Sequence, residues 1–189
     1  FFGIDFDEGA LLDVEKGDYG PYYQSQRGEI YQCFAKKLVS EGMAYPCFLT
    51  EDELAAIRQA QEEAKETTGI YGKYAEQSRN LTYDEIKANI DAGKPYVVRL
   101  RSTGNHDLPS EEIRYIEVED AIRGKLSMPE NDQDIIILKA TGIPTYHFAH
   151  VIDDHFMRTT HVVRGEEWLM SLPIHVELFE KLGFDMPVY

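Results

Sequence analysis

Residues 141–183 read TGIPTYHFAHVIDDHFMRTTHVVRGEEWLMSLPIHVELFEKLG and carry the clearest secondary-structure pattern of the chain. Apolar residues recur at three- and four-residue steps over 145–157, which predicts a helix. The short, β-branched segment 159–163 predicts a buried strand. A second helical pattern begins near Trp168, and Gly183 is its expected C-terminal cap. Helix, strand and helix, with charged residues after the strand, are typical of an α/β fold that binds a ligand there.

Three side chains of this stretch indicate a carboxylate pocket. Tyr146 and His150 are four residues apart and share a face of the predicted helix. Arg164 follows the predicted strand, and a guanidinium group matches the two oxygens of a carboxylate. A structural alternative stays open, in which Arg164 pairs with Glu166 or Glu167 and Tyr146 belongs to the core.

A metal site is the rival interpretation of the same helix. Histidine and aspartate at steps of three and four can bind a metal ion, which would suit a metal-dependent hydrolase that uses the cluster at 147–155. No established metal-binding signature such as H-E-x-x-H is present, so we expect no metal here. The candidate ligands are His147, His150, Asp153, Asp154, His155 and His161.

Further elements are predicted on the N-terminal side of this stretch. Residues 30–39 form the apolar stripe of a helix that Ser25 would cap and Gly42 would end. Two capping boxes of the form T-x-x-E predict further helix starts at Thr50 and Thr82. Alternating residues predict strands over 95–101, 113–118 and 135–138, with a loop over 103–110.

Composition limits the classes of protein that are possible. Of the 189 residues, 43% are hydrophobic, which is enough for a packed core, and no apolar run approaches the length of a membrane span. The net charge of −15 argues against a broad nucleic-acid surface. Dense basic residues are found only at Arg99 and Arg101 and at Arg114, Arg123 and Lys125, and ordinary solvated charge is the alternative for each. Of these, Arg99, Arg101 and Arg123 are the candidates for local contacts with RNA. Cys33 and Cys47 suit a reducing, cytoplasmic location, and Cys33 is expected to be packed.

Several long phrases resemble the catalytic domain of bacterial glutamyl-tRNA synthetases. They are PTYHFA, VIDDHFM, TTHVVRGEEWL and PIHVELFEKLG in the second half of the chain, and GPYYQSQR before residue 28. The resemblance implies that Tyr146 and Arg164 hold the substrate L-glutamate. It implies the same for His150, although many members of the family have asparagine there. It places Glu167 and Trp168 beside ATP.

The resemblance also implies an architecture and an activity. It implies an α/β fold: a partial, Rossmann-type class I catalytic domain, formed by residues 1–44 and 139–189. An inserted α+β lobe, residues 45–138, would meet the acceptor end of tRNA(Glu). The implied reaction uses ATP and Mg²⁺ to activate glutamate before its transfer to tRNA. The HIGH and KMSKS motifs of the family are absent from this sequence, so we expect an excised fragment that is inactive by itself.

One departure from the family concerns zinc. Many members carry a zinc knuckle that begins Cys-x-Cys, but here Cys47 is followed by Leu49, and Tyr74 and Ser78 lie where a later cysteine is expected. One thiolate cannot complete a four-ligand zinc site, so no zinc is expected. A glutamyl-queuosine tRNA synthetase is the alternative within the same fold, and the missing cysteines argue against it.

Overall fold

A three-stranded antiparallel sheet lies at the centre of the computed structural model, which describes residues 6–109 and 111–189. Its central strand is β4 (Val97–Leu100), with β3 (Ala44–Cys47) on one side and β7 (Ile136–Leu138) on the other. β4 and β7 fall inside the predicted strands. β3 is not predicted, because Pro46 interrupts its pattern; an edge strand tolerates a residue that has no N–H to donate.

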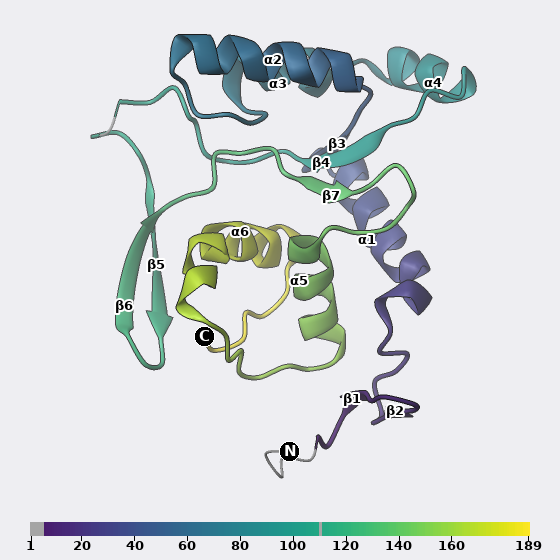
Figure 1. Cartoon of the computed structure of the whole chain (residues 1–189), viewed down its shortest axis with the longest axis vertical. Coiled ribbons are helices and arrows are strands. Elements are labelled where there is room, and N and C mark those ends of the chain that lie inside the picture. The colour runs from purple at the N-terminus through teal and green to yellow at the C-terminus, as the bar shows by residue number, and fades with distance from the viewer. Residues whose placement is uncertain (1–5, 110) are drawn as a thin grey trace.

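α1 (Gly28–Ser40) packs against this sheet through the predicted apolar stripe, in which Tyr31, Ala35 and Leu38 are buried. The predicted cap is wrong, because Ser25 belongs to a short 3-10 helix (Gln24–Gln26) and Arg27 holds the N-cap position. The N-terminal segment before α1 includes residues 1–5, which lie outside the described residues. From residue 6 onward this segment forms a small hairpin of β1 (Gly9–Ala10) and β2 (Glu15–Lys16), at the bottom of Figure 1.

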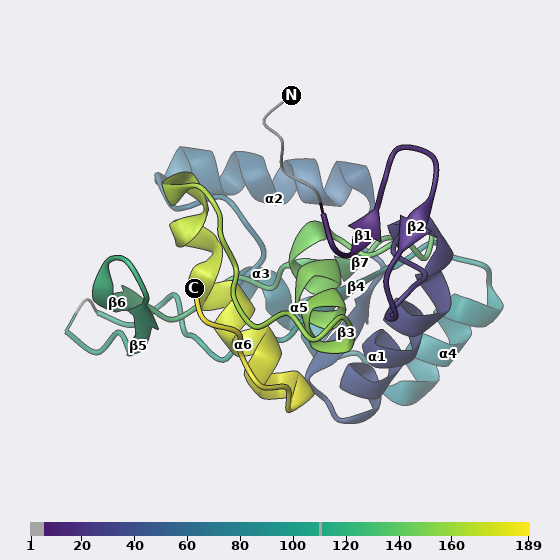
Figure 2. The ribbon, with the colours of Figure 1, turned by 90° about the horizontal axis from the view of Figure 1, so that it is seen from below.

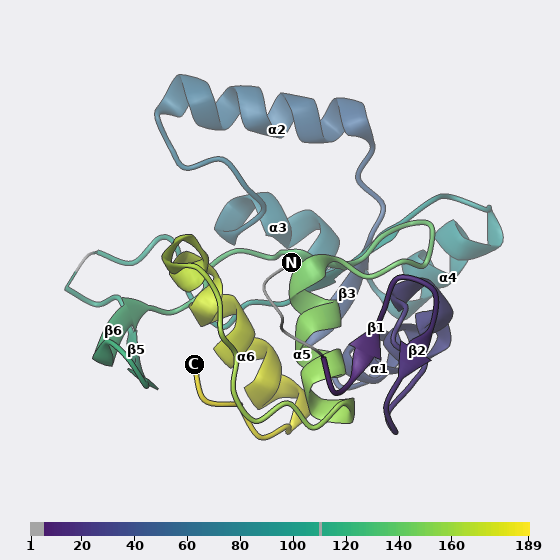
Figure 3. The same cartoon turned by 60° about the horizontal axis from the view of Figure 1, so that its bottom comes forward.

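Three helices follow β3. α2 (Glu51–Ala64) and α4 (Tyr83–Asp91) begin at the two predicted capping boxes, and in both the threonine hydroxyl accepts the N3 backbone N–H while the N3 glutamate accepts the N-cap N–H. α3 (Gly72–Arg79) is not predicted; its N-cap residue offers no side-chain cap. α2 lies on the outside of the molecule, as Figure 3 shows, and Gln61 is its one buried residue.

β5 (Tyr115–Asp120) and β6 (Gly124–Pro129) form a regular hairpin. One face of it is apolar, because Ile116 pairs with Met128 and Val118 pairs with Leu126. That face packs against the beginning of α6 and the end of the chain. In Figures 1 and 2 the hairpin therefore stands at the edge of the molecule, beside α6.

The second half of the chain confirms both predicted helices but not the strand between them. α5 (Tyr146–Phe156) and α6 (Leu172–Leu182) are joined through a 3-10 helix (Glu166–Ser171), and Gly183 caps α6 in the left-handed conformation. The predicted strand 159–163 is wrong: this segment makes only an isolated parallel bridge between His161 and Val188. It has no second neighbouring strand among the described residues, and Val163 is exposed.

The main core draws on all three predicted parts of the chain. α1, the sheet, α5 and α6 contribute to one buried cluster, and the predicted boundary at residue 45 falls inside β3. Hydrogen bonds between α6 and residues of the predicted lobe reinforce this packing. Glu177 on α6 accepts them from the Thr103 backbone N–H (2.8 Å) and from the Asn131 side chain (2.7 Å). The division into a catalytic domain and an inserted lobe stays a prediction.

Candidate functional site

The N-terminal half of α5 presents the first two predicted site residues on one face. The Tyr146 and His150 rings are stacked, with centroids 5.7 Å apart and an interplanar angle of 21°. Tyr146 is 47% exposed, so it is not the core residue of the structural alternative. The spacing of four residues on a helix is what brings the two rings together.

Arg164 lies in the irregular segment before the 3-10 helix. Its Nη1 lies 3.3 Å from Nδ1 of His175, and its guanidinium carbon lies 4.7 Å from the centroid of the Tyr189 ring. Its Nη2 is buried and has no hydrogen-bond partner among the described residues. The predicted alternative pairing with Glu166 or Glu167 is not formed within the described ranges, because Glu166 pairs instead with Arg123.

His175 and Tyr189 complete this group, and sequence reasoning missed both. The His175 ring lies 4.4 Å from the His150 ring and 6.1 Å from the Tyr146 ring, and the Tyr189 hydroxyl lies 3.0 Å from His150 Nε2. One signal was available for His175: it sits three residues after Leu172, within the buried stripe of α6. We call the whole group the His–Arg cluster; it comprises Tyr146, His147, His150, Arg164, His175 and Tyr189.

Burial keeps the imidazoles of this cluster neutral. It lowers the pKa of His150 to about 4 and that of His175 to about 2, and the positive charge of Arg164 adds to both shifts. Burial raises the pKa of Asp154 to about 6. Asp154 lies 3.3 Å from His150 Nε2, but its Oδ2 has no hydrogen-bond partner among the described residues, so the two do not form an ion pair at neutral pH. Arg164 is then the one charged member of the cluster.

The two residues predicted to lie beside ATP are on the 3-10 helix next to this cluster. The Trp168 ring lies 4.9 Å from the Tyr146 ring and is exposed on part of its surface, and Glu167 is exposed. A cavity of about 290 Å³ lies nearby, between this segment and the loop that joins β5 to β6; Arg123, Arg164 and Glu166 are among its lining residues.

The predicted RNA-contact arginines do not form one patch. Arg99 is 7% exposed and donates from Nη1 to the Asp134 carbonyl (2.8 Å). Arg101 lies over the Tyr45 ring and donates to the Arg79 carbonyl. Arg123 lies apart from these two residues, in the turn between β5 and β6. Arg99 and Arg101 therefore belong to the sheet, whereas Arg123 lies beside the His–Arg cluster.

The side chains of the alternative metal site point to different partners. Asp153 accepts hydrogen bonds from Arg27 (2.7 Å) and Tyr31, and the His155 ring stacks on Phe184 at 3.6 Å. In the described part of the chain no three His, Cys, Asp or Glu residues converge as metal ligands. A hydrolase that uses the cluster at 147–155 therefore has no assembled centre in these ranges.

The two cysteines differ in their surroundings. Cys47 is buried with its Sγ 3.5 Å from the Ser78 hydroxyl, and Tyr74 donates to Glu66, so the donor set around Cys47 does not fit a tetrahedral zinc site. The expectation of no zinc stays a prediction. Cys33, expected to be packed, is exposed, because it lies off the buried face of α1.

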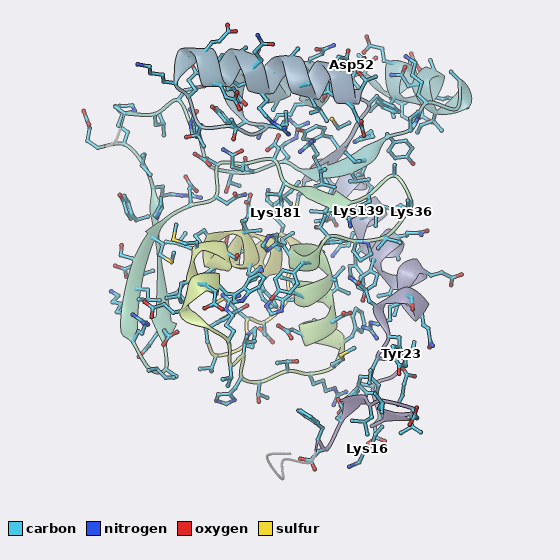
Figure 4. The ribbon with its side chains drawn as sticks, viewed as in Figure 1. Lys16, Tyr23, Lys36, Asp52, Lys139 and Lys181 are labelled. Atoms are coloured by element: carbon cyan, nitrogen blue, oxygen red, sulfur yellow. The ribbon has the colours of Figure 1, made fainter. Side chains whose placement is uncertain are left out.

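A larger cavity, of about 880 Å³, lies away from all these residues. Helices α1 and α4 and residues 138–142 line it, and its walls are mostly apolar. Lys36 and Lys139, which both line it, are labelled in Figure 4. None of the predicted site residues lines this cavity. Over the part of the chain that is described, no helix combines the length and the apolar character needed to cross a membrane.

The sequence of the chain matches a known protein family over almost its whole length. Residues 3–189 match the family described as tRNA synthetases class I (E and Q), catalytic domain. The chain belongs to this family of class I synthetase catalytic domains.

The chain is also similar to individual proteins of known name. The chain is 57% identical, over 189 residues, to the glutamate–tRNA ligase of Acetivibrio thermocellus, and 53% identical to that of Clostridium beijerinckii. It spans its whole length in both alignments but only 33% of either relative. A crystal structure of a glutamate tRNA ligase from Elizabethkingia meningosepticum in complex with its amino acid has a TM-score of 0.81 and 37% identity, over 92% of this chain and 34% of that one.

Proposed function

We propose that the chain forms the glutamate-binding part of a glutamate–tRNA ligase, which activates L-glutamate with ATP and transfers it to the 3′ end of tRNA. One observation carries the proposal: Arg164 is partly buried in an aromatic and imidazole setting, with its Nη2 unpartnered among the described residues. An unpartnered buried guanidinium nitrogen is costly unless a ligand satisfies it. Two relatives whose alignments cover the whole chain carry the name of this enzyme.

The His–Arg cluster fits a carboxylate of the substrate. Arg164 supplies the positive charge and a planar donor group, and the partly exposed Tyr146 lies on the open side of the cluster. The neutral His150 offers a hydrogen bond without adding charge. In this reaction glutamate itself is the nucleophile, so these residues bind and orient it, and no protein nucleophile is required.

ATP would lie on the side of Trp168. Its partly exposed ring, 4.9 Å from Tyr146, offers an aromatic face for the nucleotide, and Glu167 lies next to it in the chain. Mg²⁺ commonly reaches such sites with the phosphates of the nucleotide and keeps several waters, so the lack of a protein cage in the described ranges is compatible with it. ATP supplies the adenylyl group when it is bound.

We further propose that residues 45–138 form the lobe that meets the acceptor end of tRNA(Glu). The hydrogen bonds of Asp134 support a separate lobe, because its side-chain partners Tyr45, Arg79 and Ser102 all lie within residues 45–138. Of the predicted contact residues, Arg101 and Arg123 remain partly exposed, whereas Arg99 is held in the interior. Arg123→Ala should reduce the salt dependence of tRNA binding by about one phosphate contact.

The test of the pocket is a calorimetric titration of the chain with L-glutamate, L-glutamine and L-aspartate. Arg164→Lys should weaken glutamate binding by about 1–3 kcal/mol, because a point charge replaces a planar donor group. Arg114→Lys is the matched control, since this arginine pairs with Glu130 on the exposed hairpin. Equal losses in the two variants, or equal binding of glutamate and glutamine, would contradict the proposal.

The isolated chain should not catalyse glutamate-dependent pyrophosphate exchange. The HIGH and KMSKS sequences are absent from it, and they supply groups that stabilise charge on the phosphates. Loss of one such donor typically costs roughly 10²–10³ in rate, and several are absent together. Exchange above background that disappears in an Arg164→Ala variant would show that the catalytic groups are assigned wrongly.

A further inference from the structure

His175 is the most deeply buried member of the His–Arg cluster and lies against four of its other five members, all except Tyr189. It is 0% exposed, in the first turn of α6. Its Nε2 lies 3.0 Å from His147 Nδ1, its Nδ1 lies 3.3 Å from Arg164 Nη1, and its ring packs on the His150 ring. A buried imidazole needs polar partners for its ring nitrogens, and here one of the two partners is Arg164.

The partners of His175 determine where its proton lies. Arginine can only donate hydrogen bonds, so His175 Nδ1 must accept from Arg164. The neutral ring then carries its proton on Nε2 and donates it to His147 Nδ1. His147 in turn must hold its own proton on Nε2. Burial keeps the pKa of His175 at about 2, so this neutral form persists at physiological pH.

We propose that His175 is a positioning residue, which fixes Arg164 through Nη1 so that Nη2 faces the carboxylate of the substrate. Two contacts hold the guanidinium: the hydrogen bond to His175 and the packing of its face on Tyr189. Nη2 is left buried and unpartnered within the described ranges. The inference rests on the proposed function, because that function supplies the carboxylate.

A neutral acceptor suits this task better than a carboxylate. An aspartate at position 175 would also hold Arg164, but it would neutralise the charge that attracts the substrate. Imidazole accepts the hydrogen bond and leaves the full positive charge available. The inference therefore predicts effects that differ between replacements of the same residue, according to whether each one keeps an acceptor for Arg164 and whether it adds a negative charge.

Four variants separate positioning from packing. The Oδ1 of His175→Asn falls near the position of Nδ1, so this variant keeps the acceptor for Arg164, whereas His175→Gln places its acceptor near Nε2 and His175→Leu has none. We expect His175→Asn to bind glutamate within about threefold of the parent chain, and His175→Gln and His175→Leu to bind it about tenfold more weakly, as fits one lost hydrogen bond to a charged group. His175→Asp should keep Arg164 ordered yet bind glutamate more weakly than His175→Asn.

Nuclear magnetic resonance reads the positioning directly, without substrate. In the parent chain the imidazole nitrogens of His175 should show a protonated Nε2 and an unprotonated Nδ1. The Arg164 Nη groups should give separate signals because their rotation is restricted, and this separation should persist in His175→Asn and His175→Asp and collapse in His175→Gln.

The outcomes distinguish this inference from the proposed function. If the parent chain shows the restricted Arg164 signals but does not bind glutamate, the proposed function fails while the fixation of Arg164 stands. If the proton of His175 lies on Nδ1, or if Arg164 remains equally restricted in His175→Gln, the inference is overturned. Thermal unfolding of each variant identifies any that fail to fold; the comparison between the similarly sized asparagine and glutamine variants then decides the question.

Discussion

Replacing Asp134 by alanine should be among the most damaging single changes in the chain. Asp134 is 1% exposed, and its carboxylate accepts five hydrogen bonds from three separate segments. The donors are Arg79 Nε (2.6 Å) and Nη2, the Tyr45 hydroxyl (2.6 Å), and the backbone N–H and hydroxyl of Ser102 (both 2.9 Å). The carboxylate thereby joins α3 and β3 to the segment that follows β4.

The expected loss follows from what the substitution leaves behind. Arg79 would remain largely buried without its counter-ion, and breaking a buried ion pair from one side costs about 3–5 kcal/mol. The buried Tyr45 hydroxyl would also lose its acceptor, a further cost that overlaps with the first. We therefore expect the free energy of unfolding to fall by about 4 kcal/mol, which corresponds to a decrease in Tm on the order of 10 °C for a chain of this size.

Urea denaturation followed by circular dichroism measures this change, with Asp91→Ala as the control. Asp91 also pairs with a basic residue, Lys87, but both side chains are more than half exposed, so its loss should cost less than about 1 kcal/mol. If Asp134→Ala cost no more than Asp91→Ala, the carboxylate would not join these segments, and the argument from its hydrogen bonds would be refuted.

Three further changes test other parts of the structure. His150→Gln should reduce the acid sensitivity of the chain. The folded-state pKa of His150 is about 4, below its ordinary value, so its contribution to the free energy of unfolding is complete above pH 6.5 and is lost as the pH falls toward 4. The loss is about 3 kcal/mol in all, and urea denaturation at pH 7 and pH 4 would reveal it. Thr50→Ala should lower the free energy of unfolding by about 1 kcal/mol, measured against Thr50→Ser, which retains the capping hydroxyl that accepts from the Glu53 N–H. A thiol reagent should modify Cys33 in the native chain and Cys47 only after unfolding; equal rates for the two would contradict their assigned exposure.

The elements that the sequence predicts well are those whose causes are local. The starts of α2 and α4 follow from Thr50 and Thr82, because a capping box is formed within four residues. α3 escapes prediction for the converse reason: it begins at Gly72, after a tyrosine that does not cap it. The helices of the second half are predicted because their apolar faces repeat over three turns.

The failures have non-local causes. The β-branched segment 159–163 has strand propensity, but a strand also needs neighbours, and this one finds only Val188 among the described residues. The pocket hypothesis correctly places Tyr146 beside His150, since both lie on one helix. It missed His175: the place of this residue in the apolar stripe of α6 indicates burial, but its contact with α5 depends on how the two helices pack.

The strand order β3-β4-β7 has a consequence for how the chain folds. β4 is the only strand that pairs with both of the others, yet β3 ends at Cys47 and β4 begins at Val97, with three helices between them. β7 arrives later still, at Ile136. A chain emerging from the ribosome must therefore hold β3 as an unpaired edge until a long intervening segment has been made, and contacts so distant in sequence form slowly. Helices α2 and α4, which carry their own capping signals, can form during that interval and shorten the effective distance that the strands must close.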